Sequence, residues 1–120
     1  MRRAHTYTPQ ALAAARVLGL EIARGRRLRR WTAEDLAERC GVSRLTLRRI
    51  ERGDPTVALG TVFEAAVLTG VALFAPGPAE LDIVEATAKL RLALLPRRVR
   101  HADVPISDAY SWILLTARRV

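Results

Sequence analysis

Two short helical patterns separated by a three-residue turn are the feature that most constrains the fold of this chain. Thr32 and Ser43 each precede one of these patterns, and both residue types are preferred as helix N-caps. Gly41 stands where the first pattern ends. Glycine is favoured at such a position because it readily adopts the left-handed conformation that terminates many helices. Gly53 stands at the end of the second pattern. Residues 32–53 are therefore predicted to form two short helices joined by a tight turn.

Small and apolar residues inside this segment have the spacing of a helix-turn-helix. Ala37 is the small residue needed where the two helices cross, and Val42 is the apolar residue that follows the turn. Leu47 and Ile50 lie three residues apart and form the inner side of the second helix. The segment from Thr32 to Gly53 thus predicts a DNA-binding protein whose second helix enters the major groove.

The outer face of that second helix follows from the position of its inner face. The N-terminal residues of a recognition helix contact base edges, and two arginines one turn apart are suited to bidentate contacts with guanine. A leucine there can meet a thymine methyl group. The residues predicted for base readout are Arg44, Leu45, Thr46 and Arg48. The residues predicted to contact phosphates are Thr32, Ser43, Arg49 and Arg52. The alternative is that these arginines only form a solvated helix face.

Basic charge is concentrated in the first half of the chain. Residues 1–52 hold 13 arginines and 5 acidic residues, whereas residues 53–120 hold 7 basic and 7 acidic residues. The whole net charge of +8 therefore lies in the first half. This distribution is typical of a polyanion binder, because each cation set against a phosphate releases a counterion. Nucleic acid is therefore favoured as the partner over an acidic membrane surface or an acidic protein, and the predicted helix-turn-helix makes that nucleic acid double-stranded DNA.

Three further helical patterns flank the two short ones, and they cover residues 9 to about 29, 59–69 and 79–95. Gly19 and Gly25 weaken the first of them, so a break near either glycine is an alternative to one continuous helix. The chain is thus predicted to be all-α, with five helices. One DNA-binding and dimerisation domain is expected over residues 1–95, followed by a tail over 96–120 that is mobile or held by a partner.

The helical pattern over residues 79–95 carries two neighbouring apolar stripes, which make its apolar arc wider than a single core contact requires. The first stripe contains Leu81, Val84, Ala88 and Leu95. The second stripe, which we expect a second copy of the chain to cover in a homodimer, contains Ile83, Thr87, Leu90 and Leu94. Whether this helix or the tail forms the dimer stays open at this point.

Residues 18–71 resemble the Xre, or lambda-repressor-like, family of DNA-binding domains. The resemblance rests on DLA, GVS and IERG in order at the family's separations, and on a fourth helix that ends in TGV. It implies a five-helix domain that binds a palindromic operator as a homodimer. It also implies that Glu51 pairs with an arginine of the first helix, for which Arg26 is the candidate, as a structural brace. The other four arginines of RGRRLRR are assigned to phosphates or solvent. Ala33 departs from the family, which usually has Gln there.

A narrower resemblance involves the C-terminal half. A domain of this type, then a Pro/Gly break, one more helix and LPRRVR, is similar to the HipB-like antitoxins, which repress their own operon and bind a HipA-type kinase toxin. The tail departs from them by continuing to ISDAYSWILLTARRV. The residues predicted to contact a toxin are Tyr110, Trp112, Ile113, Leu114 and Leu115. The alternatives are that they close the dimer or form a disordered end. A stand-alone repressor with no toxin partner is the alternative function.

The sequence contains no catalytic constellation, since HExxH, CxxC, GxSxG and a phosphate-binding glycine loop do not occur. We expect no enzyme activity, cofactor or metal, and Cys40 is expected to be a small core residue. One cysteine, no secretory signal and no apolar run of about 18 residues predict a cytoplasmic, nucleoid-associated protein without a membrane partner. An RNA-binding or nonspecific architectural protein is the competing class.

Overall fold

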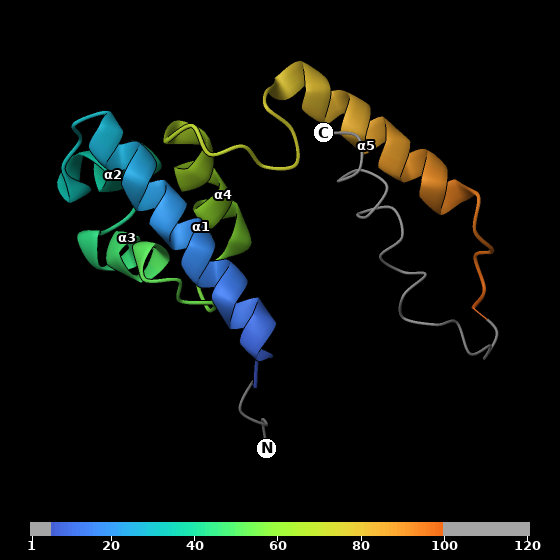
Figure 1. Ribbon diagram of the computed structural model, residues 1–120, viewed down its shortest axis with the longest axis horizontal. Coiled ribbons are helices and arrows are strands. Elements are labelled where there is room, and N and C mark those ends of the chain that lie inside the picture. Colours follow the sequence, from blue (N-terminus) through green and yellow to red (C-terminus); the bar gives the residue numbers. More distant parts are fainter. Residues whose placement is uncertain (1–5, 100–120) are drawn as a thin grey trace. The chain divides into compact units, whose positions relative to one another are not determined.

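The computed structural model describes residues 6–99, and within them the fold is all-helical (Figure 1). The helices are α1 (Pro9–Leu28), α2 (Ala33–Cys40), α3 (Arg44–Glu51), α4 (Leu59–Leu68) and α5 (Pro78–Ala93). The predicted all-α, five-helix architecture is confirmed. The last helix begins one residue earlier and ends two residues earlier than its sequence pattern. The chain divides into two units between Val84 and Glu85, so the bundle of α1–α4 and helix α5 are described separately.

The N-termini of α1, α2 and α3 are capped by the side chains that precede them, whereas α4 has no side-chain cap. The Thr8 hydroxyl accepts a hydrogen bond from the Ala11 amide (3.1 Å), and proline occupies the first position of α1. Thr32 and Asp35 form a capping box, in which the Asp35 amide donates to the Thr32 hydroxyl (3.1 Å) and the Thr32 amide to the Asp35 carboxylate (2.8 Å). The hydrogen bond from the Thr32 amide lowers the pKa of the Asp35 carboxyl below its ordinary value. The caps fix where α1 and α2 begin.

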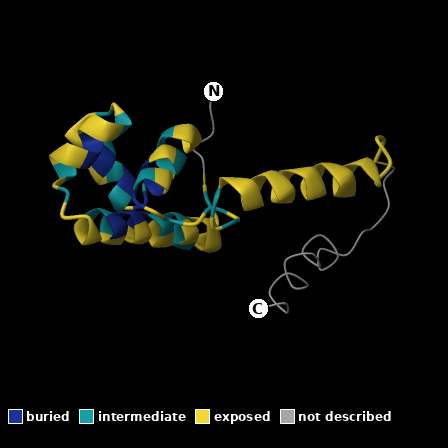
Figure 2. Cartoon of the chain, turned by 90° about the horizontal axis from the view of Figure 1, so that it is seen from above, coloured by how far each residue is buried: buried dark blue, intermediate teal, exposed yellow. Residues whose placement is uncertain are grey.

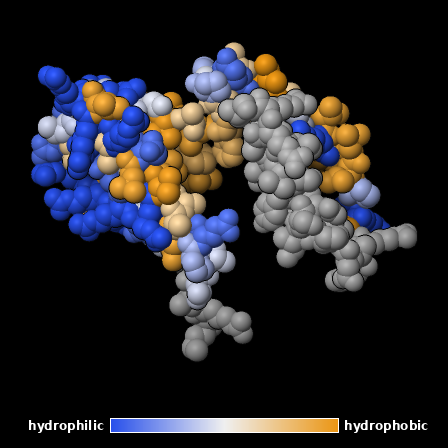
Figure 3. All heavy atoms as spheres, in the orientation of Figure 1, coloured by the Kyte–Doolittle hydropathy of each residue, from blue (hydrophilic) through white to orange (hydrophobic). Residues whose placement is uncertain are grey.

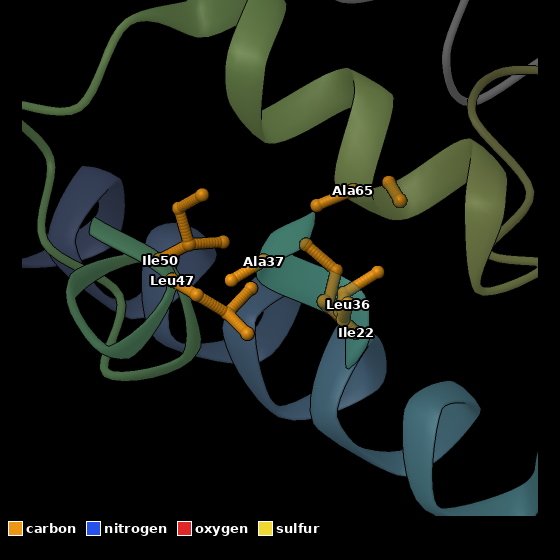
Figure 4. Packing of buried hydrophobic residues seen from close by; sticks show 7 residues of the cluster. Ile22, Leu36, Ala37, Leu47, Ile50 and Ala65 are labelled. Carbon is orange, nitrogen blue, oxygen red and sulfur yellow. The ribbon is translucent and has the colours of Figure 1, made fainter. Parts of the chain in front are cut away.

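One apolar cluster joins the four helices of the bundle (Figure 4). Ile22 of α1, Leu36 of α2 and Leu47 of α3 have no exposed surface at all. The remaining buried members are small or lie beside them, namely Ala37, Ile50, Ala65 and Ala66. Figure 2 shows that buried residues are confined to these helices and the turns between them, whereas every residue of α5 is exposed. The bundle therefore has its own core.

Gly19 and Gly25 do not interrupt α1, which runs unbroken from Pro9 to Leu28, so a break near either is wrong. Both glycines are buried where other backbones approach closely. A Cβ on Gly19 would lie 2.5 Å from the Ile50 carbonyl oxygen, and one on Gly25 would collide with the Thr69 carbonyl. Glycine lowers the helix propensity of α1 at both positions. Its missing Cβ allows α1 to pack closely against the C-terminal ends of α3 and α4.

Candidate nucleic-acid interface

Helices α2 and α3 meet through the turn at residues 41–43. Gly41 has φ +69°, and the Val42 amide donates to the Ala37 carbonyl oxygen (2.9 Å), which completes the end of α2. Ala37 is 3 % exposed, so its small side chain lies inside the crossing of the two helices. Leu47 and Ile50 on the inner side of α3 anchor that helix to the core. The two helices thus have the geometry expected for a helix-turn-helix.

The N-terminal half of α3 presents its predicted readout residues at the surface. Leu45 is 67 % exposed, although burial of a leucine would be favourable, and Arg44 and Arg48 are also exposed. Thr46 is half-buried, and its hydroxyl accepts a hydrogen bond from Ser43 (3.1 Å). Figure 3 shows hydrophilic side chains gathered over the part of the bundle that contains α2 and α3. The face is polar, with one exposed aliphatic side chain among its cations.

Ion pairs divide the arginines of α3 into two kinds. Arg44 Nη1 donates to Glu34 Oε1 of α2 (2.9 Å). Arg49 is half-buried, and it donates from Nε to Asp54 (2.9 Å) and from Nη2 to the Thr56 hydroxyl (2.7 Å). Arg48 of α3 and Arg52, the C-cap of α3, are exposed and form no ion pair within residues 6–99. Arg48 and Arg52 are therefore the unpaired cations of this face, while Arg49 is fastened to the loop that follows α3.

The loop after α3 is ordered by the carboxylate of Asp54. It accepts hydrogen bonds from the Thr56 amide (2.8 Å), the Thr56 hydroxyl (2.6 Å) and Arg49. The bonds from the Thr56 hydroxyl and from Arg49 lower the Asp54 pKa to about 2. Arg49, predicted from the sequence only as an outward phosphate contact, thus also holds the α3–α4 connection.

Arg26 and Glu51, the two residues expected to pair, form a bidentate ion pair between α1 and the last residue of α3. Their side chains are only 12 % and 16 % exposed. Arg26 Nη1 also donates to the Trp31 carbonyl oxygen (3.0 Å), so the same guanidinium holds the connection between α1 and α2. The hydrogen bond to Glu51 raises the Arg26 pKa. This pair sets the position of α3 relative to α1, and neither of its side chains lies on the outer face of α3.

A second arginine of RGRRLRR is structural, which corrects the assignment of four of the five to phosphates or solvent. Arg29 Nη1 donates to the Thr69 carbonyl oxygen (2.7 Å) and to that of Gly25 (3.3 Å). Thr69 is the C-cap of α4, so Arg29 satisfies a carbonyl at that helix end, where a cation is also favoured by the dipole. No local pattern around Arg29 indicates this partner, which lies 40 residues away in the sequence.

Trp31 is a structural residue that the sequence interpretation did not single out. It packs against the core cluster, and the Arg39 guanidinium lies 4.1 Å from its ring centroid, with that of Arg29 at 5.8 Å. These distances are those of cation–π contacts. Arg39 and Arg29 therefore stack on the ring at the connection between α1 and α2.

Cys40, at the end of α2, packs against the core cluster as expected for a small apolar residue. Burial raises the pKa of its thiol, so the reactive thiolate is disfavoured at neutral pH. Among residues 6–99, no three His, Cys, Asp or Glu side chains are placed to hold a metal ion. No helix in the same range is long and apolar enough to span a bilayer.

Helix α5 has no buried residue, and large apolar side chains remain exposed along it. Leu90 is 62 % exposed and Leu94, just after the helix, 76 %. Ile83 and Thr87, the other two residues of the predicted dimer stripe, are also exposed and take part in further contacts of their own. The predicted toxin contacts at residues 110 and 112–115 lie outside the described residues.

A helical bundle in which two short helices cross at a tight turn, with exposed arginines along the second, defines a helix-turn-helix DNA-binding protein. Residues 22–74 match the family model described as Helix-turn-helix, which spans α2, α3, α4 and the second part of α1. The match covers 53 of the 120 residues and identifies this segment as a helix-turn-helix domain of the Xre, or lambda-repressor-like, type, which supports a DNA-binding transcription regulator. The family is a regulatory one and not a family of enzymes. Neither curated proteins nor solved structures give a significant match to the chain.

Proposed function

We propose that this protein is a sequence-specific transcriptional repressor that binds a palindromic operator in double-stranded DNA as a homodimer. The observation that carries this proposal is the exposure of Arg44, Leu45 and Arg48 on the outer face of α3. They lie in the N-terminal part of the helix, which is the part of a recognition helix that contacts the bases. An exposed leucine between two arginines suits a groove that offers both guanine acceptors and thymine methyl groups.

In this proposal each residue of the face has a role that its position supports. Arg44 and Arg48 read guanine, Leu45 meets a thymine methyl group, and Thr46 makes a polar base contact. Arg52, which has no ion pair in the described part of the chain, is a phosphate contact. The other phosphate contacts are Thr32 and Ser43 at the starts of α2 and α3, and Arg49 through the N–H donors that Asp54 and Thr56 leave free.

The homodimer is proposed to form through α5. This helix spans 16 residues without one buried side chain, and exposed leucines at positions 81, 90 and 92 give it more apolar surface than a solvated helix usually carries. The stripe of Ile83, Thr87, Leu90 and Leu94 is the proposed contact. Residues 1–95 would then be the DNA-binding and dimerisation domain and 96–120 the tail. A monomeric mass for the full chain at about 10 µM, far above the protein concentrations of most operator titrations, would contradict this arrangement.

We also propose that the repressor is the autoregulating antitoxin of a HipA-type toxin and acts in the cytoplasm on the nucleoid. The support is the order of segments, with a helix-turn-helix domain, a Pro/Gly break, α5 and then LPRRVR. The alternative is a stand-alone Xre-type repressor. Truncation after Pro96 separates them, because an antitoxin whose tail binds the toxin should lose toxin binding and keep operator binding.

The experiment that tests the repressor proposal is a titration of the full chain against duplex DNA from upstream of its own gene, with a scrambled duplex as control, at two salt concentrations. A repressor should prefer the upstream duplex at both salts, by about 1000-fold or more at physiological salt. Equal affinities with a steep salt dependence would favour a nonspecific architectural or RNA-binding protein.

A further inference from the structure

Glu34 and Arg44 join the N-terminal ends of α2 and α3. Arg44 is the first residue of α3 and Glu34 the second of α2, and Arg44 Nη1 donates to Glu34 Oε1 at 2.9 Å. The side chains are 59 % and 67 % exposed. An ion pair this exposed contributes little to folding stability. The main effect of this ion pair is therefore on the position of the Arg44 guanidinium.

Arg44 stands at a position that electrostatics alone would not favour. The first turn of a helix is the positive end of its dipole, and α3 has no acidic residue there. Glu34 supplies the missing negative charge from the neighbouring helix. Glu34 is itself favoured where it stands, because it lies in the first turn of α2. The carboxylate is thus held by one helix and compensates a cation at the start of the next.

The contact engages only Nη1 of Arg44 among the polar contacts in the described part of the chain, so the remaining N–H donors of the guanidinium are available. Guanine is read by two parallel N–H donors aimed at O6 and N7. A long side chain loses rotamer freedom when it is ordered in this way, and one ordered before binding loses less. Arg48, one turn along α3, has no ion pair within residues 6–99. Of the two arginines proposed to read guanine, only Arg44 is therefore held by an ion pair.

We propose that Glu34 is a specificity-determining residue of the DNA interface, which holds the Arg44 guanidinium in one orientation for a guanine. This inference rests on the proposed function, because it requires Arg44 to read a base. Exclusion of water by bound DNA strengthens the ion pair at the moment when orientation matters. Glu34 then acts through Arg44 and contacts no base itself.

The test uses the full chain and a library of duplexes with about 20 random base pairs, roughly two helical turns. The wild-type protein selects a site, and R44A identifies the base pair whose preference depends on Arg44. We expect E34Q to lower the preference at that base pair by about fivefold or more, within the range for one bidentate contact. We expect the preferences at other positions to stay, and affinity for unselected duplexes to stay or rise because a negative charge is lost.

Three variants separate orientation from charge. E34D keeps the charge but shortens the side chain, so we expect it to lose the preference as E34Q does. E38Q removes an equal charge one turn along α2, where no ion pair to Arg44 exists, and should leave the preference unchanged. In an R44A background, E34Q should change no base preference. Thermal melts of each variant check that the fold is kept.

Three results would overturn the inference. If E34Q raised affinity for all duplexes equally and kept the preference at the Arg44 base pair, Glu34 would only compete with phosphates for Arg44. If the wild-type protein selected no sequence, the proposed function would fail and the inference with it. A selected site that is read by Arg44 but is insensitive to both E34Q and E34D would overturn the inference alone.

Discussion

Arg26 and Glu51 form the connection that fixes α3 against α1, with Arg26 Nε 2.8 Å from Glu51 Oε2 and Nη2 3.0 Å from Oε1. The two residues are 25 positions apart, and both are mostly buried. Since Glu51 is the last residue of α3, this pair holds the C-terminal end of α3 against α1 and so determines the orientation of α3 in the bundle. The position of the outer face of α3 therefore depends on two residues that do not lie on it.

Removal of one partner should be costly, because it leaves the other charge buried and unpaired. We expect E51A to destabilise the fold by about 3 kcal/mol, at the lower end of the range for broken buried pairs. Urea unfolding followed by circular dichroism measures this change. The exposed pair of Glu85 and Lys89 on α5 gives the matched control, and E85A should change stability by less than about 0.5 kcal/mol. Equal effects of the two substitutions would contradict this account of the brace.

Gly19 should not tolerate alanine, although alanine is the better helix former. Its added Cβ would lie 2.5 Å from the Ile50 carbonyl oxygen and 2.6 Å from that of Glu51. Both are backbone atoms that cannot rotate away, so we expect G19A to destabilise by about 1–3 kcal/mol.

Gly60 provides the control for that substitution, since it also lies in a helix and a Cβ there meets nothing within 4 Å. We expect G60A to stabilise the fold by up to about 1 kcal/mol, the helix-propensity difference between the two residues. Thermal denaturation of G19A, G60A and the wild type measures both changes in stability. A stabilising G19A would show that α1 and α3 can separate at no cost.

The Asp54 carboxylate should make stability depend on pH in the acidic range. Its pKa of about 2 in the folded chain is below the ordinary 3.8, so its contribution is complete above about pH 4 and is lost as pH falls toward 2. D54N removes this titration. The difference in urea midpoint between wild type and D54N should thus be constant from pH 7 to about pH 4.5 and shrink below that. A difference independent of pH down to pH 2 would contradict the hydrogen bonds described.

The Cys40 thiol should be protected in the folded protein, because burial raises its pKa. We expect alkylation by iodoacetamide at pH 8 to be at least about tenfold slower for the folded than for the urea-unfolded chain, since the thiolate is the nucleophile. The raised pKa also means that this group favours folding below its unfolded pKa and loses that contribution as pH rises. Equal alkylation rates would place the thiol in solvent.

Local signals in the sequence predicted the helix-turn-helix because each of its parts is short-range. Caps at Thr32 and Ser43, the left-handed Gly41, and the apolar pair of Leu47 and Ile50 all act within one turn of their position. The ion pair of Arg26 with Glu51 was expected only through the family resemblance.

Contacts between distant segments could not be predicted in the same way. A glycine in a helical pattern lowers the predicted helix propensity, and only the folded chain shows that the Ile50 carbonyl lies against Gly19. Likewise, nothing near Arg29 indicates its carbonyl partner at Thr69, and the Glu34 partner of Arg44 depends on how α2 and α3 cross.

The most direct test of the central claim is the affinity of R44A/R48A for duplex DNA from upstream of the protein's own gene, compared with wild type at physiological salt. If α3 is the reading helix, the double variant should lose about 100-fold or more and approach its affinity for a scrambled duplex, since each bidentate contact contributes about 1–3 kcal/mol of discrimination. A loss of about twofold or less, well below the effect of one such contact, would contradict sequence readout by these two arginines.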